Sequence, residues 1–277
     1  PCCEKKIRGK EKMLKIENLV KTFGRGTINE LRALDGIDFH GREGDFITII
    51  GSNGAGKSTL MNSIAGVFPS DSGSIVLDGI ELSRMPEQKR ARYIGRVFQD
   101  PLKGTAFDMT IEENLSIAYN KTRSRGLQAG INKADRELFR EKLSMLGMGL
   151  EDRMNHPVGL LSGGQRQALT LMMATINKPQ LLLLDEHTAA LDPATAEKVL
   201  KLTADIVAEE KITCLMVTHN MQSALDLGNR TIMMDSGNVI YDVSGEERKA
   251  LTVPDLLEKF KEQAGRMLDN DRMLLGN

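Results

Sequence analysis

The sequence predicts an α/β fold built on an open, largely parallel β-sheet with helices on its faces. Three short apolar runs are nearly continuous, which is typical of strands in a parallel sheet because both of their faces are covered. Each run is followed by a stretch with the spacing of a helix, and this alternation is typical of α/β sheets. The predicted strands are 47–50, 181–184 and 212–217, and the predicted helices are 57–67, 194–209 and 221–227.

Two further regions depart from this alternation. Apolar and polar residues alternate over 14–19, which predicts a half-buried strand in an antiparallel β subdomain. Helical periodicity dominates from about 100 to 179, which predicts an inserted α-helical subdomain with helices over 110–119 and 132–146. One more amphipathic helix is predicted over 253–267. The expected organisation is a disordered tail or cloning remnant over 1–12, a main domain over 13–250 and a helical extension over 251–277.

The composition narrows the class of protein. A chain of 277 residues is long enough for one or two domains. Its 37 basic and 38 acidic side chains leave a formal charge of −1, which argues against a protein that coats nucleic acid. The longest apolar runs fall far below the roughly 18 residues of a membrane span. Three cysteines and four scattered histidines show no zinc-like spacing, so we expect a reduced protein without a His/Cys metal cluster.

The segment GSNGAGKST over 51–59 matches the phosphate-binding pattern GxxxxGK[ST], between a predicted strand and a predicted helix. Glycines let backbone N–H groups surround phosphate oxygens, and the helix N-terminus adds the positive end of its dipole. We expect Lys57 to reach the β- and γ-phosphates of ATP and Ser58 to bind Mg²⁺. The predicted nucleotide contacts in this loop are Gly51, Ser52, Asn53, Gly54, Ala55, Gly56, Lys57, Ser58 and Thr59.

Polar side chains stand at the ends of several predicted strands. Asp185 and Glu186 follow the strand 181–184, so we expect Asp185 to hold Mg²⁺ and Glu186 to activate the attacking water. Gln99 and His219 end two other strands, and Asp192 opens the next helix. Ligands of open α/β sheets bind at the carboxyl ends of strands, so these positions indicate one crevice.

The segment LSGGQ over 161–165 has two interpretations. Ser162 and Gln165 have the spacing of a capping box at the start of a helix. Gly163 and Gly164, in contrast, are poor helix formers, each costing roughly 1 kcal/mol relative to Ala. Their use there would be to expose backbone N–H groups to a second anion.

LSGGQ lies between the phosphate loop and LLLLDE, and this ordered set resembles the ABC-type ATPases, the nucleotide-binding subunits of ABC transporters. The resemblance covers residues 13 to about 244 and implies a P-loop NTPase (RecA-like) core, ATP and Mg²⁺ as cofactors, and ATP hydrolysis. It makes Gln99 the Q-loop glutamine and a Mg²⁺ ligand, and His219 the switch histidine. It also implies a stacking role for Phe23 on adenine. The signature residues Ser162, Gly163, Gly164 and Gln165, with Asp192 of the D-loop, then contact ATP.

The segment DEHTAALDP differs from common patterns of this family at His187, where many relatives have proline, and at Ala189. Neither change removes a phosphate, metal or water contact. The segment resembles a bacterial branch that works with tryptophan/tyrosine-type substrate-binding proteins.

The resemblance implies a homodimer at the cytoplasmic face of a bacterial membrane, bound to membrane-spanning permease subunits that dock in a groove around 98–109. A substrate-binding protein completes such an importer of a small solute, for example an amino acid. The alternative is a soluble non-transport ABC-type ATPase, such as one for iron–sulfur cluster assembly. Co-purifying partners would separate these two functions.

Overall fold

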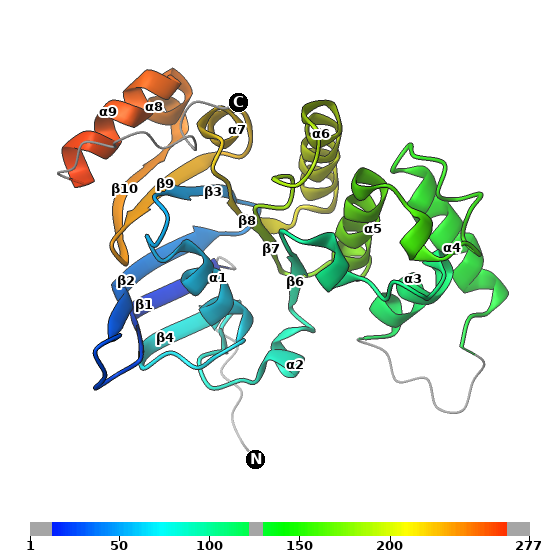
Figure 1. The fold of residues 1–277 in the computed structure, drawn as a ribbon, viewed down its shortest axis with the longest axis horizontal. Coiled ribbons are helices and arrows are strands. Elements are labelled where there is room, and N and C mark those ends of the chain that lie inside the picture. The colour runs from blue at the N-terminus through cyan, green and yellow to red at the C-terminus, as the bar shows by residue number, and fades with distance from the viewer. Residues whose placement is uncertain (1–12, 122–129, 265–277) are drawn as a thin grey trace, which may run out of the picture.

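The computed structural model describes residues 13–121 and 130–264 and contains two β-sheets with helices around them (Figure 1). The larger sheet has the order β10-β9-β3-β8-β7-β6, and its neighbours are parallel except for the pair β9 and β10. The predicted α/β sheet is therefore confirmed, whereas the predicted tail over 1–12 lies outside the described residues. Its strands are β3 (Phe46–Gly51), β6 (Ile94–Val97), β7 (Leu181–Asp185), β8 (Thr213–Val217), β9 (Arg230–Asp235) and β10 (Asn238–Ser244).

The smaller sheet is antiparallel, with the order β2-β1-β4-β5. The strand predicted over 14–19 lies within β1. Helix α1 (Lys57–Ala65) lies between the two sheets, because Leu60 and Ile64 share one core with Ile16 of β1 and Ile49 of β3. The strands of this sheet are β1 (Met13–Phe23), β2 (Leu31–Arg42), β4 (Ser72–Leu77) and β5 (Ile80–Glu81), and the short α2 (Glu87–Arg90) follows them.

Strand β7 shows why the predicted strands read as continuous apolar runs. Leu181 and Leu183 face the core around α1, whereas Leu182 and Leu184 face a second core on the opposite side of the sheet. Helices α5 (Gly163–Thr175) and α6 (Pro193–Glu210) contribute to this second core. Both faces of the strand are buried, as the sequence predicts.

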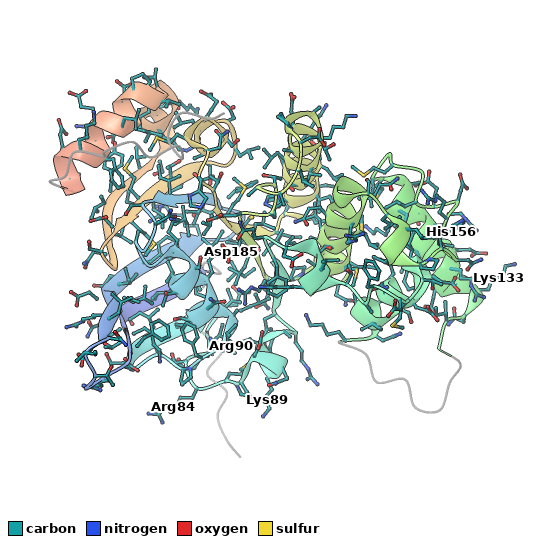
Figure 2. The ribbon with its side chains drawn as sticks, viewed as in Figure 1. Arg84, Lys89, Arg90, Lys133, His156 and Asp185 are labelled. Atoms are coloured by element: carbon teal, nitrogen blue, oxygen red, sulfur yellow. The ribbon has the colours of Figure 1, made fainter. Side chains whose placement is uncertain are left out.

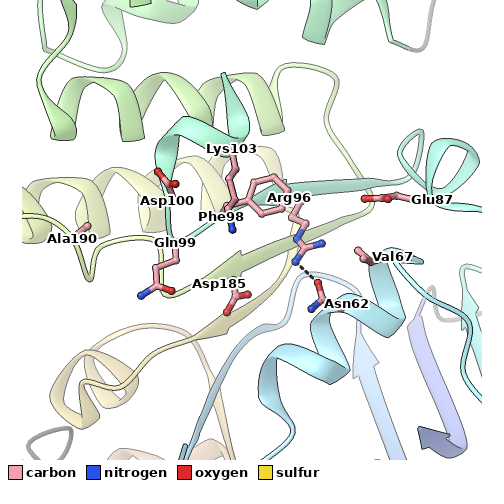
Figure 3. A pocket seen from close by; sticks show the side chains of 10 residues that line it. All are labelled: Asn62, Val67, Glu87, Arg96, Phe98, Gln99, Asp100, Lys103, Asp185 and Ala190. Atoms are coloured by element: carbon pink, nitrogen blue, oxygen red, sulfur yellow. Dashed lines mark hydrogen bonds between the residues drawn. The ribbon is translucent and has the colours of Figure 1, made fainter. Parts of the chain in front are cut away.

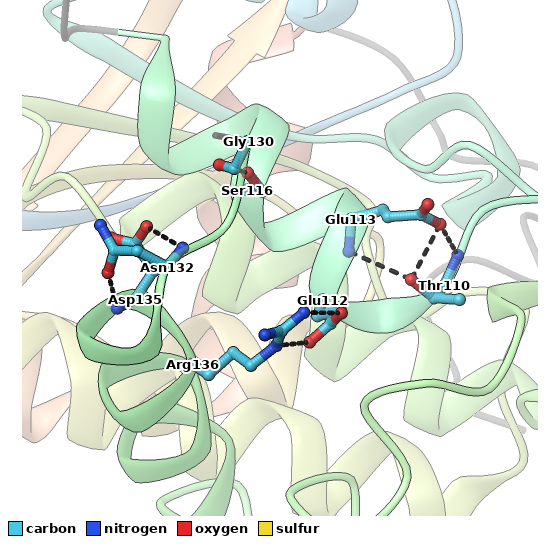
Figure 4. A network of polar contacts seen from close by, with 8 residues as sticks. All are labelled: Thr110, Glu112, Glu113, Ser116, Gly130, Asn132, Asp135 and Arg136. Atoms are coloured by element: carbon cyan, nitrogen blue, oxygen red, sulfur yellow. Dashed lines mark hydrogen bonds and ion pairs between the residues drawn. The ribbon is translucent and has the colours of Figure 1, made fainter. Parts of the chain in front are cut away.

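Between β6 and β7 the described residues form a group of helices that lies at one side of the molecule (Figure 1). The capping boxes of Thr110 and Asn132 start α3 (Ile111–Asn120) and α4 (Lys133–Ser144). The guanidinium of Arg136 in α4 donates to both carboxylate oxygens of Glu112 in α3, at 2.9 and 3.2 Å (Figure 4). These contacts join the two helices. The elements are η1 (Pro101–Gly104), α3 (Ile111–Asn120), α4 (Lys133–Ser144), η2 (Val158–Leu160) and α5.

Helices α7 (Met221–Asp226), α8 (Gly245–Ala250) and α9 (Val253–Ala264) cover the β10 side of the larger sheet. Leu256 and Phe260 of α9 are buried in one cluster with Ile50 and Met221, so this helix packs close to the end of β3. Within residues 13–121 and 130–264, no helix has the length and apolar character that a bilayer crossing needs.

Candidate nucleotide and magnesium site

The connection from β3 to α1 needs glycine at Gly51, the last residue of β3, and at Gly56. A Cβ atom at Gly51 would lie 2.1 Å from the carbonyl oxygen of Met234, and one at Gly56 would lie 2.5 Å from that of Ala33. Gly56 also has a φ of +98°, which L-residues rarely adopt. The loop therefore fits closely against neighbouring backbone at these two positions.

The N-terminus of α1 is arranged to receive an anion. Its N-cap residue is Gly56, and no side chain caps its first turn. Lys57 is only 5% exposed, and its ammonium group donates to the carbonyl oxygens of Gly51 and Ser52 at 2.7 and 2.9 Å. A cation next to an uncapped helix N-terminus matches the chemistry of phosphate, so the predicted residues fit the phosphates of ATP.

The turn between β9 and β10 supports this loop, and its residues were not predicted to belong to the site. The Asp235 carboxylate is buried and accepts from the Ser52 hydroxyl at 3.0 Å and from the Ser236 hydroxyl at 2.9 Å. The N–H of Gly237 donates to the carbonyl of Ala55 at 3.1 Å. The sequence Asp-Ser-Gly signals a turn, but its position beside the phosphate loop depends on β9 pairing with β3.

Two carboxylates lie where β7 ends. Asp185 is the last residue of the strand (Figure 2), and Glu186 follows with a φ of +47°. Such backbone costs a non-glycine residue roughly 1–2 kcal/mol and is concentrated at functional sites. The N–H of Glu186 donates to the carbonyl of Val217 at 3.0 Å, and its carboxylate contacts Nε2 of His219. The structure thus brings together Glu186 and His219, two of the predicted residues.

The electrostatics around Asp185 favour a cation. Burial and the charge of Glu186 raise the pKa of Asp185, and the opposing charges of Arg96, Lys57 and His219 compensate only in part. A divalent cation next to Asp185 would offset both the burial and the charge of Glu186, and would stabilise the ionised carboxylate.

Asp185 also shares a cleft of about 620 Å³ with Gln99, another predicted Mg²⁺ ligand (Figure 3). Within the described residues no group of three or more His, Cys, Asp or Glu side chains could hold a metal ion by itself. Mg²⁺ sites of ATPases commonly use one or two protein carboxylates and take their remaining ligands from phosphates and water. One carboxylate, one amide and the exposed Ser58 at the start of α1 fit this donor set.

The signature segment lies at the start of α5. Ser162 caps the helix by accepting from the N–H of Gln165 at 3.3 Å, and the Gln165 side chain accepts from the N–H of Ser162 at 3.2 Å. The capping box is therefore confirmed. A Cβ atom at Gly164 would lie 2.1 Å from Cγ2 of Thr195, so this glycine permits close packing of α5 on α6. The binding of an anion by the two glycines stays a prediction.

Asp192 precedes α6 and Phe23 ends β1, and each has contacts of its own. Asp192 caps α6 by accepting from the N–H of Thr195 at 3.1 Å, and its hydrogen bonds with Thr195 lower its pKa. It therefore lies close to the signature segment. Phe23 ends β1, and its ring packs edge-on against Phe68 at 5.2 Å between centroids. The ammonium group of Lys21 lies 5.5 Å from the Phe23 ring.

Comparison with known proteins defines the class of this chain. A family model described as ABC transporter matches residues 34–189. The chain is 44% identical to the tyrosine transport ATP-binding protein of Clostridioides difficile, over 90% of this chain and 99% of that protein. It is 34% identical to the thiamine import ATP-binding protein of Photorhabdus laumondii, over 88% and 95% of the two chains.

The fold is also similar to a solved dimeric ATP-binding cassette in a post-hydrolysis state with ADP and Pi. The TM-score is 0.72 at 30% identity, and the match covers 83% of this chain and 98% of that one. The chain belongs to the ABC transporter family, as the motifs predict. It is an ATP-binding cassette that hydrolyses ATP, with Mg²⁺ as the usual ion.

Proposed function

We propose that this chain is the ATPase subunit of a bacterial importer and that the transported solute is an aromatic amino acid such as tyrosine. The observation that carries the hydrolytic part is the set of polar groups at the ends of β3, β8, β7 and β6, which are adjacent in the sheet. The solute is supported by the 44% identity with a tyrosine transport ATP-binding protein over nearly the whole of both chains.

In this proposal each residue has one task. Lys57 binds the β- and γ-phosphates, and Asp185, Gln99 and Ser58 hold Mg²⁺, which neutralises charge on the phosphates. Glu186 orients the attacking water and accepts its proton, and His219, which contacts the Glu186 carboxylate, keeps it in place. Phe23 would stack on the adenine, since its side chain is 38% exposed at the end of β1.

The signature segment would act on the ATP of a second copy. Ser162 and Gly163 are exposed at the start of α5, so a partner subunit can reach them. A two-fold dimer would place each ATP between Lys57 of one copy and Ser162 of the other. ATP then joins the two subunits, and its hydrolysis releases them. The dimeric state of the similar cassette supports this arrangement.

Permease subunits would dock at the cleft that Gln99 and Phe98 line. Leu102 and Phe107 are each 49% exposed and Leu160 is 66% exposed, so apolar side chains are available nearby. A short helix from each permease subunit would cover them. In this proposal the chain lies at the cytoplasmic face of the membrane, and a substrate-binding protein acts on the other side. The proposed ATPase domain spans 13–250 and includes the helical subdomain over about 100–179.

Iron–sulfur cluster assembly is not favoured. Cys214 is fully buried in β8, and burial raises the pKa of its thiol well above the usual value, so it is a poor cluster ligand. The similar proteins named above are ATP-binding subunits of transport systems.

The test is reconstitution of the whole system. The tagged chain is purified in detergent with its permease subunits, placed in liposomes with ATP inside, and supplied with its substrate-binding protein and labelled tyrosine outside. We expect uptake that depends on ATP and is lost with Glu186→Gln. ATP-driven uptake of another solute would overturn the substrate, and co-purification with cluster-assembly proteins instead of permeases would overturn the transport function.

A further inference from the structure

Arg96 of β6 lies in the cleft that contains Gln99 and Asp185 (Figure 3), and none of the tasks above uses it. Its guanidinium donates through Nη2 to Oδ1 of Asn62, which belongs to α1, the helix that starts with Lys57. The guanidinium carbon also lies 4.5 Å from the centroid of the Phe98 ring, within the range of a cation–π contact. One side chain therefore joins α1 to the segment that leads into Gln99.

The arrangement of Arg96 is poorly explained by stability alone. Its Nε is buried and has no hydrogen-bond partner among the described residues, and its Nη2 donates to a neutral amide, that of Asn62. Desolvation of such a cation is costly, and the carboxylates of Asp185 and Glu87 offset it only through space. The buried Nε without a partner is a cost to stability that a role of the guanidinium in the cleft would explain.

Phe98 is held from a second side. Gln167 of α5 is 1% exposed and donates to the carbonyl oxygen of Phe98 at 3.4 Å. The ring of Phe98 is thus fixed by Arg96 and its peptide group by Gln167. The next residue is Gln99, so both contacts act on the residue that precedes the Gln99 amide in the cleft.

We propose that Arg96 is a positioning residue for ATP hydrolysis, which ties α1 to the Phe98–Gln99 segment and thereby holds Gln99 opposite Asp185. This inference rests on the proposed role of Gln99 as a Mg²⁺ ligand. It goes further by assigning a task to a residue outside the phosphate loop, the two carboxylates, the signature and the switch histidine.

The test is a Mg²⁺ titration of ATP hydrolysis with the full chain and four variants, Arg96→Met, Arg96→Lys, Asn62→Ala and Gln99→Ala. We expect Arg96→Met to lower kcat by about 10- to 100-fold, the scale of a misplaced catalytic group, and to raise the Mg²⁺ concentration for half-maximal rate. The affinity for ATP without Mg²⁺ should stay within about twofold, because the phosphate loop is intact. Arg96→Lys keeps the charge but not the planar stacking, so its kcat should be intermediate.

A double-mutant cycle gives the control. If Arg96 acts through Asn62, Arg96→Met combined with Asn62→Ala should be no worse than Arg96→Met alone. Full multiplication of the two effects would overturn the link to α1. A wild-type kcat and Mg²⁺ dependence in Arg96→Met, or a lower melting temperature with an unchanged kcat per folded molecule, would overturn the inference. If Arg96→Met fails to fold, Arg96→Lys and Asn62→Ala carry the same test. Wild-type behaviour of Gln99→Ala would instead overturn the proposed role of Gln99.

Discussion

Helices α1 and α5 both begin at glycine-containing motifs, but their first turns are built differently. The first turn of α1 has no side-chain cap and lies beside the Lys57 ammonium group. The first turn of α5 is closed by its own Ser162–Gln165 capping box, and Gly164 is used for close packing on α6. The phosphate site is thus ready within one chain, whereas the signature segment is already satisfied by its own residues. The anion-binding role of the signature therefore needs its own test, with two copies of the chain.

We expect the largest effect from a change to Glu186, which follows β7 in the nucleotide site. Glu186→Gln keeps the size of the side chain and cannot take a proton, so hydrolysis should fall by about 100-fold or more. ATP binding should persist, because Lys57 and the loop are unchanged. Turnover of bound nucleotide in single-turnover assays would measure this. A rate near that of the wild type would show that Glu186 is neither the base nor the residue that orients the water.

Mixing two inactive variants tests whether the two helix N-termini serve one ATP. Lys57→Ala damages the phosphate site and Ser162→Arg damages the signature, so each homodimer should be inactive. In a mixture that exchanges subunits, half of the dimers are mixed and each has one intact site. We expect at most about a quarter of the wild-type rate, and less if both sites must act together. No rescue after verified subunit exchange would contradict the shared site.

His187 follows Glu186 and contacts Thr203 of α6. The Thr203 hydroxyl donates to the carbonyl of Val199 at 2.8 Å, so in the 3.1 Å contact with Thr203 the Nε2 of His187 is the donor. Burial lowers the pKa of His187 from 6.5 to about 4. As the pH falls, His187 therefore takes up a proton in the unfolded chain before it does so in the folded chain. The free energy of unfolding consequently decreases between about pH 6.5 and pH 4.

The full loss amounts to about 3 kcal/mol of unfolding free energy. Urea unfolding across this pH range, without Mg²⁺ or nucleotide, would measure it. His187→Gln keeps a donor for Thr203 and should flatten this part of the pH profile, whereas His156→Gln, at an exposed histidine, should leave it unchanged. An equally steep profile in His187→Gln would show that other groups cause the acid sensitivity.

We expect the smallest effect at Gly164, where a single and a double variant distinguish a packing role from an anion-binding role. Gly164→Ala keeps the backbone N–H but places a methyl group against Thr195, so it should destabilise the fold by about 1–3 kcal/mol. Adding Thr195→Ala removes the clashing atom and should restore both stability and hydrolysis. Gly51→Ala serves as the contrast, because its clash is with the Met234 carbonyl and no side-chain change relieves it. Stability restored without hydrolysis in the double variant would show that Gly164 has a use beyond packing.

Features that depend on residues close together in the chain could be predicted from the sequence. The phosphate loop is formed by consecutive residues, the apolar run of β7 requires two covered faces, and Ser162 and Gln165 have the spacing of a cap. Asp185 and His219 could be placed at strand ends because a parallel sheet orients its strands alike.

Long-range packing of the strands and helices sets which of these groups meet and which residues support them. The contact of Glu186 with His219 requires β7 to pair with β8, and the support of Ser52 by Asp235 requires β9 to pair with β3. Arg96 likewise reaches Asn62 only because α1 and β6 border one cleft. Local periodicity predicts that a strand exists but not its place in the sheet, since strand order is set by long-range packing. That is why the motif residues could be predicted from the sequence and their supporting residues could not.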